Sequence, residues 1–569
     1  MSNKAVIEFK NFSFQYRAQT EPTLQDINLT IYEGEKVLIV GPSGSGKSTL
    51  AHAINGLIPA TYPGEISGTL RIMGQDQQEL GIAGLSERVG TVLQDPDGQF
   101  VGLTVGEDIA FKLENDAVPQ SEMTGKVTEA AHAVDIYDFL GASPQELSGG
   151  QKQKTTLAGV LVGEVDILLF DEPLASLDPY TGTKTIELID RVKQQTGKTI
   201  IIIEHRLEDV LHRAVDRIIV INEGRIAADL PAAELLSSGL LQEAGIREPL
   251  YLTVLKYAGC PITPDIKPEH IETIGLEDAA DKLRGWYLAN DEQFEYPDCP
   301  PVLELRDLSF GYEKKHPVLH GVSLKLGKGE MVSIAGKNGA GKSTVSKLIC
   351  GFYRPSSGSI WMNGRDIGPD SIKERASRIG FVMQNPNHMI SKTMIFDEVA
   401  LGLKVRGMAE SDIEKRVHEV LQICGLYPFR NWPVSALSYG QKKRVTIASI
   451  LVLQPEIIIL DEPTAGQDYR HYNEMMEFLL GLSKQGITVI MITHDMHLML
   501  EYAQRTIVLA DGRKIADDRP ERVLSDKAII HSANLKETSL YRLAERAEIE
   551  QPSEFVRRFI AFDREARQG

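Results

Sequence analysis

The chain has 569 residues, of which 42% are hydrophobic and 25% charged, and its formal net charge at pH 7 is −18. This length exceeds what one hydrophobic core supports, so we expect two large domains. The acidic balance argues against broad binding to the phosphate backbone of a nucleic acid. No stretch approaches the ~18 consecutive apolar residues of a membrane-spanning helix. The first residues do not resemble a signal peptide, so we expect a chain that does not cross a membrane by itself.

Residues 7–16 alternate between hydrophobic and polar side chains, which predicts a strand of a short antiparallel sheet. The hydrophobic run 36–40 predicts a buried strand, and the pattern Gly-x-x-x-x-Gly-Lys-Ser follows it and precedes a helix-like segment. In that context the glycines let backbone N–H groups turn toward phosphates, the lysine reaches phosphate oxygens and the serine can ligate Mg²⁺. The expected phosphate-binding residues are Gly41, Ser43, Gly44, Gly46, Lys47, Ser48 and Thr49.

Between Gln94 and Ser148 the sequence is polar with helical character, which predicts a helical insertion into the domain. Ser148 and the glycines after it open a further helix. A helix N-terminus with glycines is a second anion site, although a serine alone at this place is more often a simple N-cap. Both interpretations are compatible with the residues.

The hydrophobic runs 166–170 and 199–203 predict strands of a parallel sheet that is covered on both faces. The first run leads into Asp171 and Glu172, at the edge where ligands bind in open α/β sheets. Asp171 suits Mg²⁺, and Glu172 is positioned to polarise an attacking water molecule. His205 follows the second run, where a lone histidine is more often structural.

All of these features recur in the same order in the second half of the chain. The second phosphate-binding loop begins 295 residues after the first, and later features recur at offsets of 290 and 289. A tandem duplication explains this agreement, and the recurrence favours a functional role for both histidines. The equivalent residues are Gly336, Asn338, Gly339, Gly341, Lys342, Ser343, Thr344, Gln384, Ser438, Asp461, Glu462 and His494.

With these motifs the chain resembles the nucleotide-binding subunits of ABC transporters over nearly its whole length. The resemblance implies an α/β fold of two tandem P-loop NTPase domains, each with a mainly parallel sheet, an antiparallel β subdomain and a helical insertion. In that family two such domains pair head to tail, and here the pairing would be intramolecular. ATP and Mg²⁺ then lie between the phosphate-binding loop of one domain and the serine of the signature motif of the other. The signature motifs here are Leu147-Ser-Gly-Gly-Gln151 and Leu437-Ser-Tyr-Gly-Gln441.

The resemblance also implies a role for each matching residue. Glu172, His205, Glu462 and His494 would be catalytic, and Tyr16 and Tyr312 match the aromatic position that stacks on adenine, although lone strand aromatics are more often core. One site would combine Lys47, Ser48, Gln94, Asp171, Glu172 and His205 with Ser438 and Gly440. The other would combine Lys342, Ser343, Gln384, Asp461, Glu462 and His494 with Ser148 and Gly150. The metal ligands would be Ser48, Gln94, Asp171, Ser343, Gln384 and Asp461.

The second copy departs from the family pattern at two places. Tyr439 replaces a glycine of the signature, and Ala465-Gly-Gln-Asp468 differs from the usual form kept at Ser176-Leu-Asp178. Since both glutamates and both histidines are present, we expect two hydrolytic sites. Any asymmetry should favour the site built on the first signature.

The segments after the two glutamines, from Gln94-Asp-Pro-Asp and Gln384-Asn-Pro-Asn onward, resemble ATPases of energy-coupling-factor transporters for cobalt, nickel or vitamins. That resemblance implies an ATPase at the cytoplasmic face of the membrane. Its partners would be an integral membrane coupling protein and a substrate-binding membrane component. No nucleic-acid partner is expected.

Two alternatives remain. Tandem ABC proteins also act on the ribosome as translation factors, but these carry a long basic helical arm between their domains. Residues 241–300 instead hold five Lys and Arg against twelve Asp and Glu, with prolines that break a continuous helix. A fused ATPase of a sugar-type importer is the nearer alternative, in which one half is usually degenerate.

The expected domain organisation has five parts. They are a first ABC ATPase domain (1–235), its helical extension (236–259), a Pro-rich acidic linker (260–301), a second ABC ATPase domain (302–525) and a C-terminal helical tail (526–569).

Overall fold

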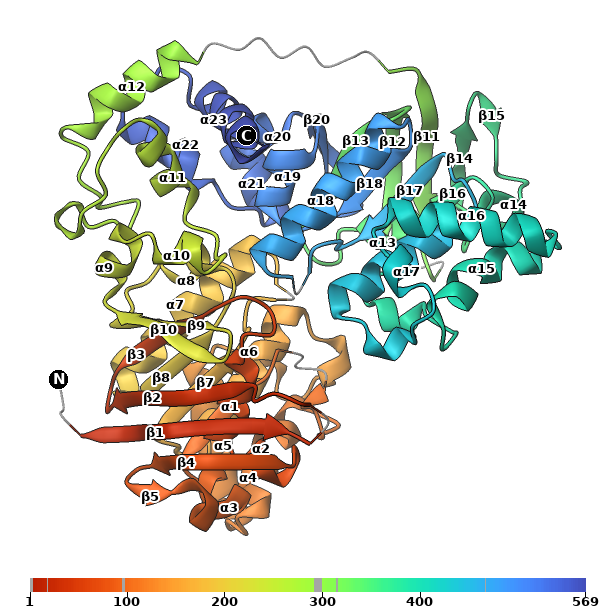
Figure 1. Ribbon diagram of the computed structural model, residues 1–569. Helices are drawn as coiled ribbons and strands as arrows, with labels where there is room; N and C mark the ends of the chain where they lie inside the picture. Colours follow the sequence, from red (N-terminus) through yellow and green to blue (C-terminus); the bar gives the residue numbers. More distant parts are fainter. Residues whose placement is uncertain are drawn as a thin grey trace. The chain divides into compact units, whose positions relative to one another are not determined.

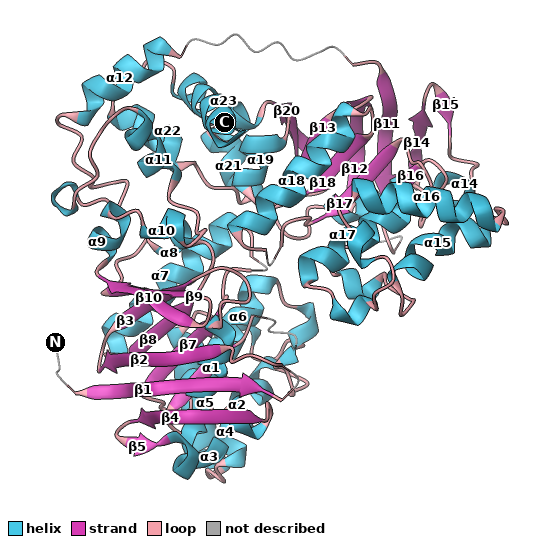
Figure 2. Cartoon of the chain, in the orientation of Figure 1, coloured by secondary structure: helices cyan, strands magenta, loops and turns pink. Residues whose placement is uncertain are grey.

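The protein folds as two compact units that divide between Trp286 and Tyr287, and each is described by itself (Figure 1). The computed structural model describes residues 4–17, 19–94, 98–175, 177–290, 299–313, 316–465 and 467–568. Figure 2 shows the sheets of each unit, in magenta, with helices packed beside them. Within the described residues, no helix combines the length and the hydrophobicity needed to span a membrane.

The first unit begins with an antiparallel sheet that carries aromatic side chains on one face. Phe9, Phe12 and Phe14 are fully or almost fully buried, and Phe9 pairs with Leu29 across the sheet. Because side chains alternate along a strand, these residues face the core while their neighbours stay closer to solvent. The strand order is β2 (Leu24–Tyr32), β1 (Ala5–Tyr16), β4 (Gly64–Ile72) and β5 (Gln75–Asp76).

A second, six-stranded sheet forms the centre of this unit. All of its neighbouring strands run parallel except the edge pair β9–β10. The four isoleucines 200–203 are completely buried, as expected for a parallel sheet covered on both faces. The strand order is β10 (Arg225–Leu230), β9 (Arg217–Asn222), β3 (Lys36–Val40), β8 (Thr199–Ile203), β7 (Ile167–Asp171) and β6 (Val89–Val92).

Helices cover this core and form the predicted insertion, which begins with a helix capped by a reciprocal Thr104–Glu107 capping box. The insertion comprises α4 (Val105–Asn115), α5 (Gln120–Ala133) and the first part of α6 (Gly149–Leu161). The other helices are α1 (Lys47–Ile54), α2 (Leu57–Ala60), α3 (Gln77–Ser86), α7 (Pro179–Thr196), α8 (Leu207–Val210), α9 (Ala232–Ser237), α10 (Leu240–Glu243) and α11 (Leu250–Tyr257).

The second unit repeats both sheets with the same strand orders. Its antiparallel sheet is β12 (Leu319–Gly327), β11 (Pro301–Phe310), β14 (Ser357–Met362) and β15 (Arg365–Asp366). Its larger sheet is β16 (Ile379–Val382), β17 (Ile457–Asp461), β18 (Thr488–Ile492), β13 (Met331–Ala335), β19 (Arg505–Ala510) and β20 (Arg513–Asp518). The predicted fold class is confirmed, and the duplication extends to the order of every strand.

The helices of the second unit follow the same plan and continue into a helical C-terminal segment. The core helices are α13 (Lys342–Ile349), α14 (Ile372–Arg375), α15 (Ile395–Val405), α16 (Glu410–Ile423), α17 (Tyr439–Leu451), α18 (Tyr469–Lys484) and α19 (Met496–Tyr502). The C-terminal helices are α20 (Pro520–Val523), α21 (Lys527–Ala533), α22 (Ser539–Arg546) and α23 (Pro552–Gln568).

The segment expected as a linker contains a helix, α12 (Ala279–Ala289), which includes the division between the units. Leu283 of this helix is completely buried. Residues 291–298 of the same segment lie outside the described residues.

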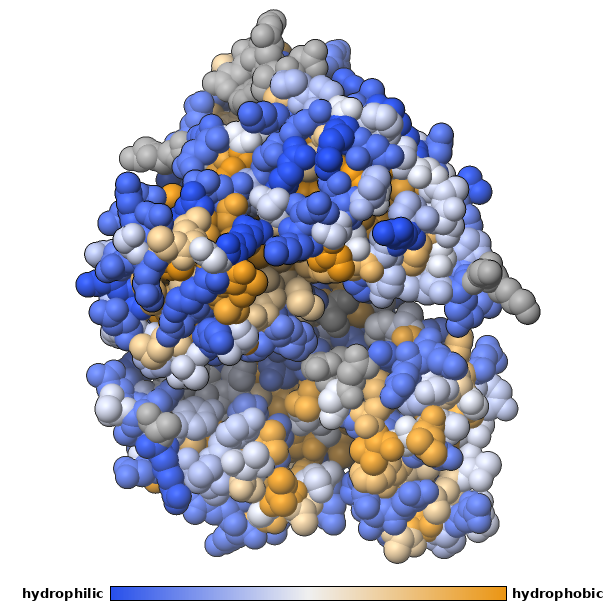
Figure 3. Space-filling model, turned by 90° about the vertical axis from the view of Figure 1, so that its right-hand side faces the viewer, coloured by the Kyte–Doolittle hydropathy of each residue, from blue (hydrophilic) through white to orange (hydrophobic). Residues whose placement is uncertain are grey.

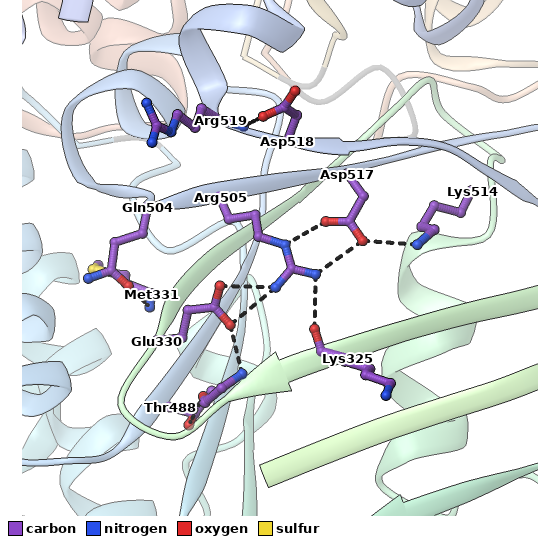
Figure 4. A network of polar contacts seen from close by, with 11 residues as sticks. Lys325, Glu330, Met331, Thr488, Gln504, Arg505, Lys514, Asp517, Asp518 and Arg519 are labelled. Carbon is purple, nitrogen blue, oxygen red and sulfur yellow. Dashed lines mark hydrogen bonds and ion pairs between the residues drawn. The ribbon is translucent and has the colours of Figure 1, made fainter. Parts of the chain in front are cut away.

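One arginine in each unit ties the two sheets of that unit together. In the second unit Arg505 donates hydrogen bonds to Glu330 and Asp517 and to the backbone carbonyl of Lys325 on β12 (Figure 4). In the first unit, Arg217 makes the equivalent contacts with Glu35, Asp229 and the carbonyl of Thr30. Charge-assisted hydrogen bonds of this kind, partly shielded from water, fix the antiparallel sheet against the parallel one.

Candidate functional site

The first phosphate-binding loop connects β3 to α1. Gly46 has φ 105°, a left-handed conformation that glycine adopts without strain, and it offers no side chain to cap α1. A side chain at Gly41 would collide with the backbone oxygen of Ile221. Lys47 is buried, and its Nζ donates hydrogen bonds of 2.8 Å to the backbone oxygens of Gly41 and Pro42. The loop therefore presents an uncapped helix N-terminus and a held cation, which together suit a phosphate group.

The second loop, between β13 and α13, has the same construction. Gly341 has φ 99°, and a side chain at Gly336 would collide with the backbone oxygen of Leu509. The Nζ of Lys342 donates to the backbone oxygens of Gly336, at 2.6 Å, and Lys337, at 3.0 Å. The two loops are thus equivalent in geometry as well as in sequence.

Each predicted adenine-stacking tyrosine is joined to its own phosphate-binding loop. The hydroxyl of Tyr16 shares a hydrogen bond of 3.1 Å with Thr49, and that of Tyr312 shares one of 3.2 Å with Thr344. Tyr312 remains 52% exposed, so part of its ring is open to a planar partner. Thr49 and Thr344, the last residues of the two phosphate-binding motifs, therefore each contact the tyrosine of their own unit.

The catalytic candidates of the first unit meet where β7 and β8 end. Nε2 of Gln94 donates to Oε2 of Glu172 at 2.7 Å, and Nε2 of His205 lies 3.0 Å from Oε1 of the same carboxylate. Glu172 has φ 48°, and its amide donates to the backbone oxygen of Ile203. A left-handed glutamate costs conformational energy, and such residues cluster at functional sites.

The two carboxylates of this edge have different electrostatic environments. Burial, reinforced by the negative charges of Glu172 and Glu204, raises the pKa of Asp171 to about 6. Burial also raises the pKa of Glu172, but the hydrogen bond and charge of His205 and the charge of Lys47 outweigh it and lower that pKa overall. Glu172 therefore loses its proton more readily than Asp171, and a general base must be deprotonated to act.

The second unit holds its glutamate differently. Thr493 donates to Oε2 of Glu462 at 3.2 Å, the amide of His494 donates to Oε1 at 3.1 Å, and Nε2 of His494 lies 3.9 Å from that oxygen. Glu462 repeats the left-handed backbone, with φ 45°. Burial and the neighbouring Asp461 raise the pKa of Glu462 to about 7, against the charge of Lys342.

Both signature serines begin helices as N-caps. The side chain of Ser148 accepts from the amide of Gln151, while the Gln151 side chain accepts from the amide of Ser148, and Ser438 forms the same capping box with Gln441. The N-cap interpretation is therefore correct at both positions. The additional role of these two helix N-termini as anion sites stays a prediction.

The second copy differs from the family pattern at Ala465-Gly-Gln-Asp468, but the aspartate of this motif has the same structural role in both copies. The side chain of Asp178 caps α7 by accepting from the amide of Thr181, and Asp468 caps α18 in the same way through His471. Ser176 and Gly466 of these motifs lie outside the described residues, as do residues 95–97 after Gln94.

Two functional candidates were missed from the sequence. Lys443, on α17, is only 1% exposed, and its Nζ donates to the backbone oxygen of Gln384 at 2.7 Å. Glu204, next to His205, is also buried, accepts from the amides of Leu174 and His205, and has its pKa raised by burial. A position-by-position comparison of the two copies could have found both residues, because Lys443 is equivalent to Gln153 and Glu204 to Thr493, which are different residue types.

The residues of the first unit fit ATP with a divalent cation. Oδ1 of Asp171 is buried and accepts no hydrogen bond from the described residues, so a cation would satisfy it. The uncapped N-terminus of α1 and the ammonium of Lys47 supply the positive field for the phosphates. Asp461, whose pKa is raised by burial, occupies the same place in the second unit.

Fold and loops together define a tandem P-loop ATPase. Residues 24–175 and 319–465 match the family model described as ABC transporter, and residues 238–310 match one described as ATP-binding cassette cobalt transporter. The chain belongs to the ABC transporter family. Its two ABC domains bind ATP, and it is an ATPase coupled to transport.

Similar proteins occur in several bacteria. One from Clostridium perfringens (strain 13) is 59% identical over 567 residues, which cover 100% of both chains. One from Enterococcus faecalis is 56% identical over 567 residues, again 100% of both chains. Their names, assigned provisionally, describe ABC transporter ATP-binding proteins. The solved structure of cbiO1 from Clostridium perfringens, titled as part of the ABC transporter complex cbiONQ, is 34% identical and covers 44% of this chain and 99% of that chain, with a TM-score of 0.39.

Proposed function

We propose that this protein is the ATP-hydrolysing subunit of an energy-coupling-factor type importer for a micronutrient such as a vitamin or a metal ion. The observation that carries the proposal is the complete residue set in both units: a phosphate-binding lysine, an edge aspartate, a glutamate and a histidine. Neither unit is degenerate, which favours this class over a sugar-type importer. The match of residues 238–310 to a cobalt transporter model supports the same class.

Each ATP would be held by groups from both units. Ser48, Gln94 and Asp171 would hold Mg²⁺ at the first phosphate-binding loop, and Ser343, Gln384 and Asp461 would do so at the second. The bound cation would neutralise charge on the phosphates. Ser438 with Gly440 would close the first site, and Ser148 with Gly150 the second, each offering a helix N-terminus to the phosphates.

In the first unit, each site side chain would have its own role in ATP hydrolysis. Lys47 would bind phosphate oxygens, and Tyr16 would orient the base. Glu172 would accept a proton from the attacking water, because its carboxylate stays ionised. His205 holds that carboxylate from one side and Gln94 from the other. In the second unit Lys342 would bind phosphate oxygens and Glu462 would accept the proton, with Thr493 and the amide of His494 holding its carboxylate.

Binding of two nucleotides would draw the units together, since neither unit alone supplies all the donors that the phosphates need. Hydrolysis would remove that attraction and let the units separate. The segments after Gln94 and Gln384 would transmit this movement to a membrane partner.

Exposed hydrophobic side chains support such a partner. Leu103 is 83% exposed and Val101 63%, and both lie between Gln94 and helix α4. Val405, which ends α15, is 72% exposed in the second unit. Figure 3 shows hydrophobic side chains at several places on an otherwise hydrophilic surface. Exposed apolar side chains in the helical insertion are suited to an integral membrane coupling protein, which would join a substrate-binding membrane component.

We further propose a peripheral location at the cytoplasmic face of the membrane, and a five-part domain organisation with boundaries near residues 235, 259, 301 and 525. In this organisation residues 526–569 form the C-terminal helical tail.

Purification of the tagged full chain from detergent-solubilised membranes tests the partner. Integral membrane proteins recovered in fixed stoichiometry would support the proposal, and recovery with ribosomes would contradict it.

A second experiment tests the shared sites. Ser148→Asp keeps an N-cap side chain but places a negative charge where a phosphate would bind. We expect unchanged thermal stability and a loss of ATP-driven closure in solution scattering, measured on a Glu172→Gln/Glu462→Gln background. Ser371→Asp is the control away from the proposed sites, because Ser371 also caps a helix, α14, there with Glu374 as its capping-box partner. Equal closure in both variants would refute shared sites.

A further inference from the structure

In the second unit, helix α17 reaches the backbone of the segment that holds Gln384. The hydroxyl of Tyr439 donates to the backbone oxygen of Gln384 at 3.1 Å. Nζ of Lys443 donates to the same oxygen at 2.7 Å and to that of Met383 at 2.8 Å. Because the two residues are four positions apart, they lie on one face of the helix, and both donate to the backbone oxygen of Gln384.

Among the residues that the structure describes in the first unit, no counterpart of this arrangement occurs. The equivalent positions are Gly149, which has no side chain, and Gln153. The side-chain amide of Gln153 donates instead to the backbone oxygen of Pro173, and its oxygen accepts from Thr185. The contact between helix α17 and the segment that holds Gln384 is therefore a further difference between the described residues of the two copies.

The hydrogen bonds that Lys443 donates to Met383 and Gln384 are expected to be stronger than those of a neutral, solvent-exposed donor. Lys443 is almost completely buried, so water does not compete for its ammonium group. A charged donor makes shorter and stronger hydrogen bonds than a neutral one, and low local polarity increases the effect. Its Nζ also lies 3.5 Å from the backbone oxygen of Asp461, so one cation contacts both segments that carry predicted metal ligands.

We propose that Tyr439 and Lys443 are positioning residues that hold Gln384 in place for hydrolysis at the Lys342 site. The inference rests on the proposed function, because it assigns Gln384 to that site. A fixed backbone at Gln384 limits the directions that its side chain can take toward the attacking water and the cation. The clamp, Tyr439 with Lys443, restrains this segment through contacts that Gly149 and Gln153 do not make with Gln94 among the described residues.

The test uses the full chain with Glu172→Gln, so that only the Lys342 site turns over. Lys443→Gln installs the residue that the first unit already accommodates at this position. We expect kcat to fall about 10-fold, as is typical when a supporting contact is lost, with KM for ATP unchanged. Hydrogen exchange at the amide of Asn385, next to the released carbonyl, should become faster. Tyr439→Phe, which removes one of the bonds, should give a smaller effect in the same direction.

Lys442→Gln is the control, since it removes the same charge from the adjacent position of α17, and it should change neither quantity. If Lys443→Gln leaves the exchange at Asn385 or kcat unchanged, or if Lys442→Gln has an equal effect, the positioning role is wrong. Failure of the proposed function would look different, because Lys342→Ala would then leave the remaining hydrolysis intact in the same background.

Discussion

Nε2 of His205 lies 3.0 Å from Oε1 of Glu172, which makes this pair a direct contact. The equivalent atoms of His494 and Glu462 are 3.9 Å apart, and Thr493 supplies a hydrogen bond to Glu462 instead. The two proposed catalytic centres are therefore equivalent in residue type at the glutamate and histidine but unequal in how the glutamate is held.

This difference predicts unequal losses when the histidines are removed. His205→Ala, measured with Glu462→Gln, should reduce single-turnover hydrolysis by about 100-fold, because Glu172 loses the direct partner of Oε1 and keeps only Gln94, on Oε2. His494→Ala, measured with Glu172→Gln, should reduce it by only about 10-fold, because Thr493 still holds Glu462. Equal losses would show that the histidines act on something other than the glutamates.

The glutamates themselves should be necessary for hydrolysis but not for binding. We expect Glu172→Gln/Glu462→Gln to lower kcat by about 100- to 10,000-fold, the usual contribution of a general base. The affinity for ATP, measured by equilibrium binding, should stay within a few-fold of the unmodified protein. Substantial residual turnover in the double variant would mean that another group activates the water.

Removing one phosphate-binding lysine should remove one nucleotide. Lys47→Ala and Lys342→Ala are each expected to lower the ATP stoichiometry from two per chain to one, because each ammonium lies at a separate helix N-terminus. Isothermal titration with ATP and Mg²⁺ measures this number. A circular dichroism melt serves as the control for folding, and an unchanged stoichiometry of two would contradict the assignment.

The arginines that join the sheets predict a stability effect independent of ATP. Arg505→Ala should destabilise the second unit, and Arg217→Ala the first, each by about 1–3 kcal/mol, since partly buried acceptors lose their charged donor. Chemical denaturation would measure both. Arg513→Ala, at an exposed position of β20, is the control and should change stability by less than about 0.5 kcal/mol.

Much of the fold follows from local patterns. Short hydrophobic runs between helical segments predict buried parallel strands, and all of the predicted strands lie within one or two residues of the observed ones. These patterns are reliable here because a strand buried on both faces tolerates few polar residues. Strand ends are less certain, as for β7, which includes Asp171, because the terminal residue can pair or bind a ligand.

The duplicated sequence by itself determined the ATPase class, since a phosphate-binding loop requires glycines and a lysine at fixed short spacings that remain visible along the chain. Only the tertiary structure decided how each glutamate is held and that Lys443 binds the backbone of Gln384. Those two residues are 59 apart in sequence, and their contact depends on where β16, β17 and helix α17 come to lie. Short spacings record local chemistry, whereas contacts between distant residues arise only from the packing of whole elements.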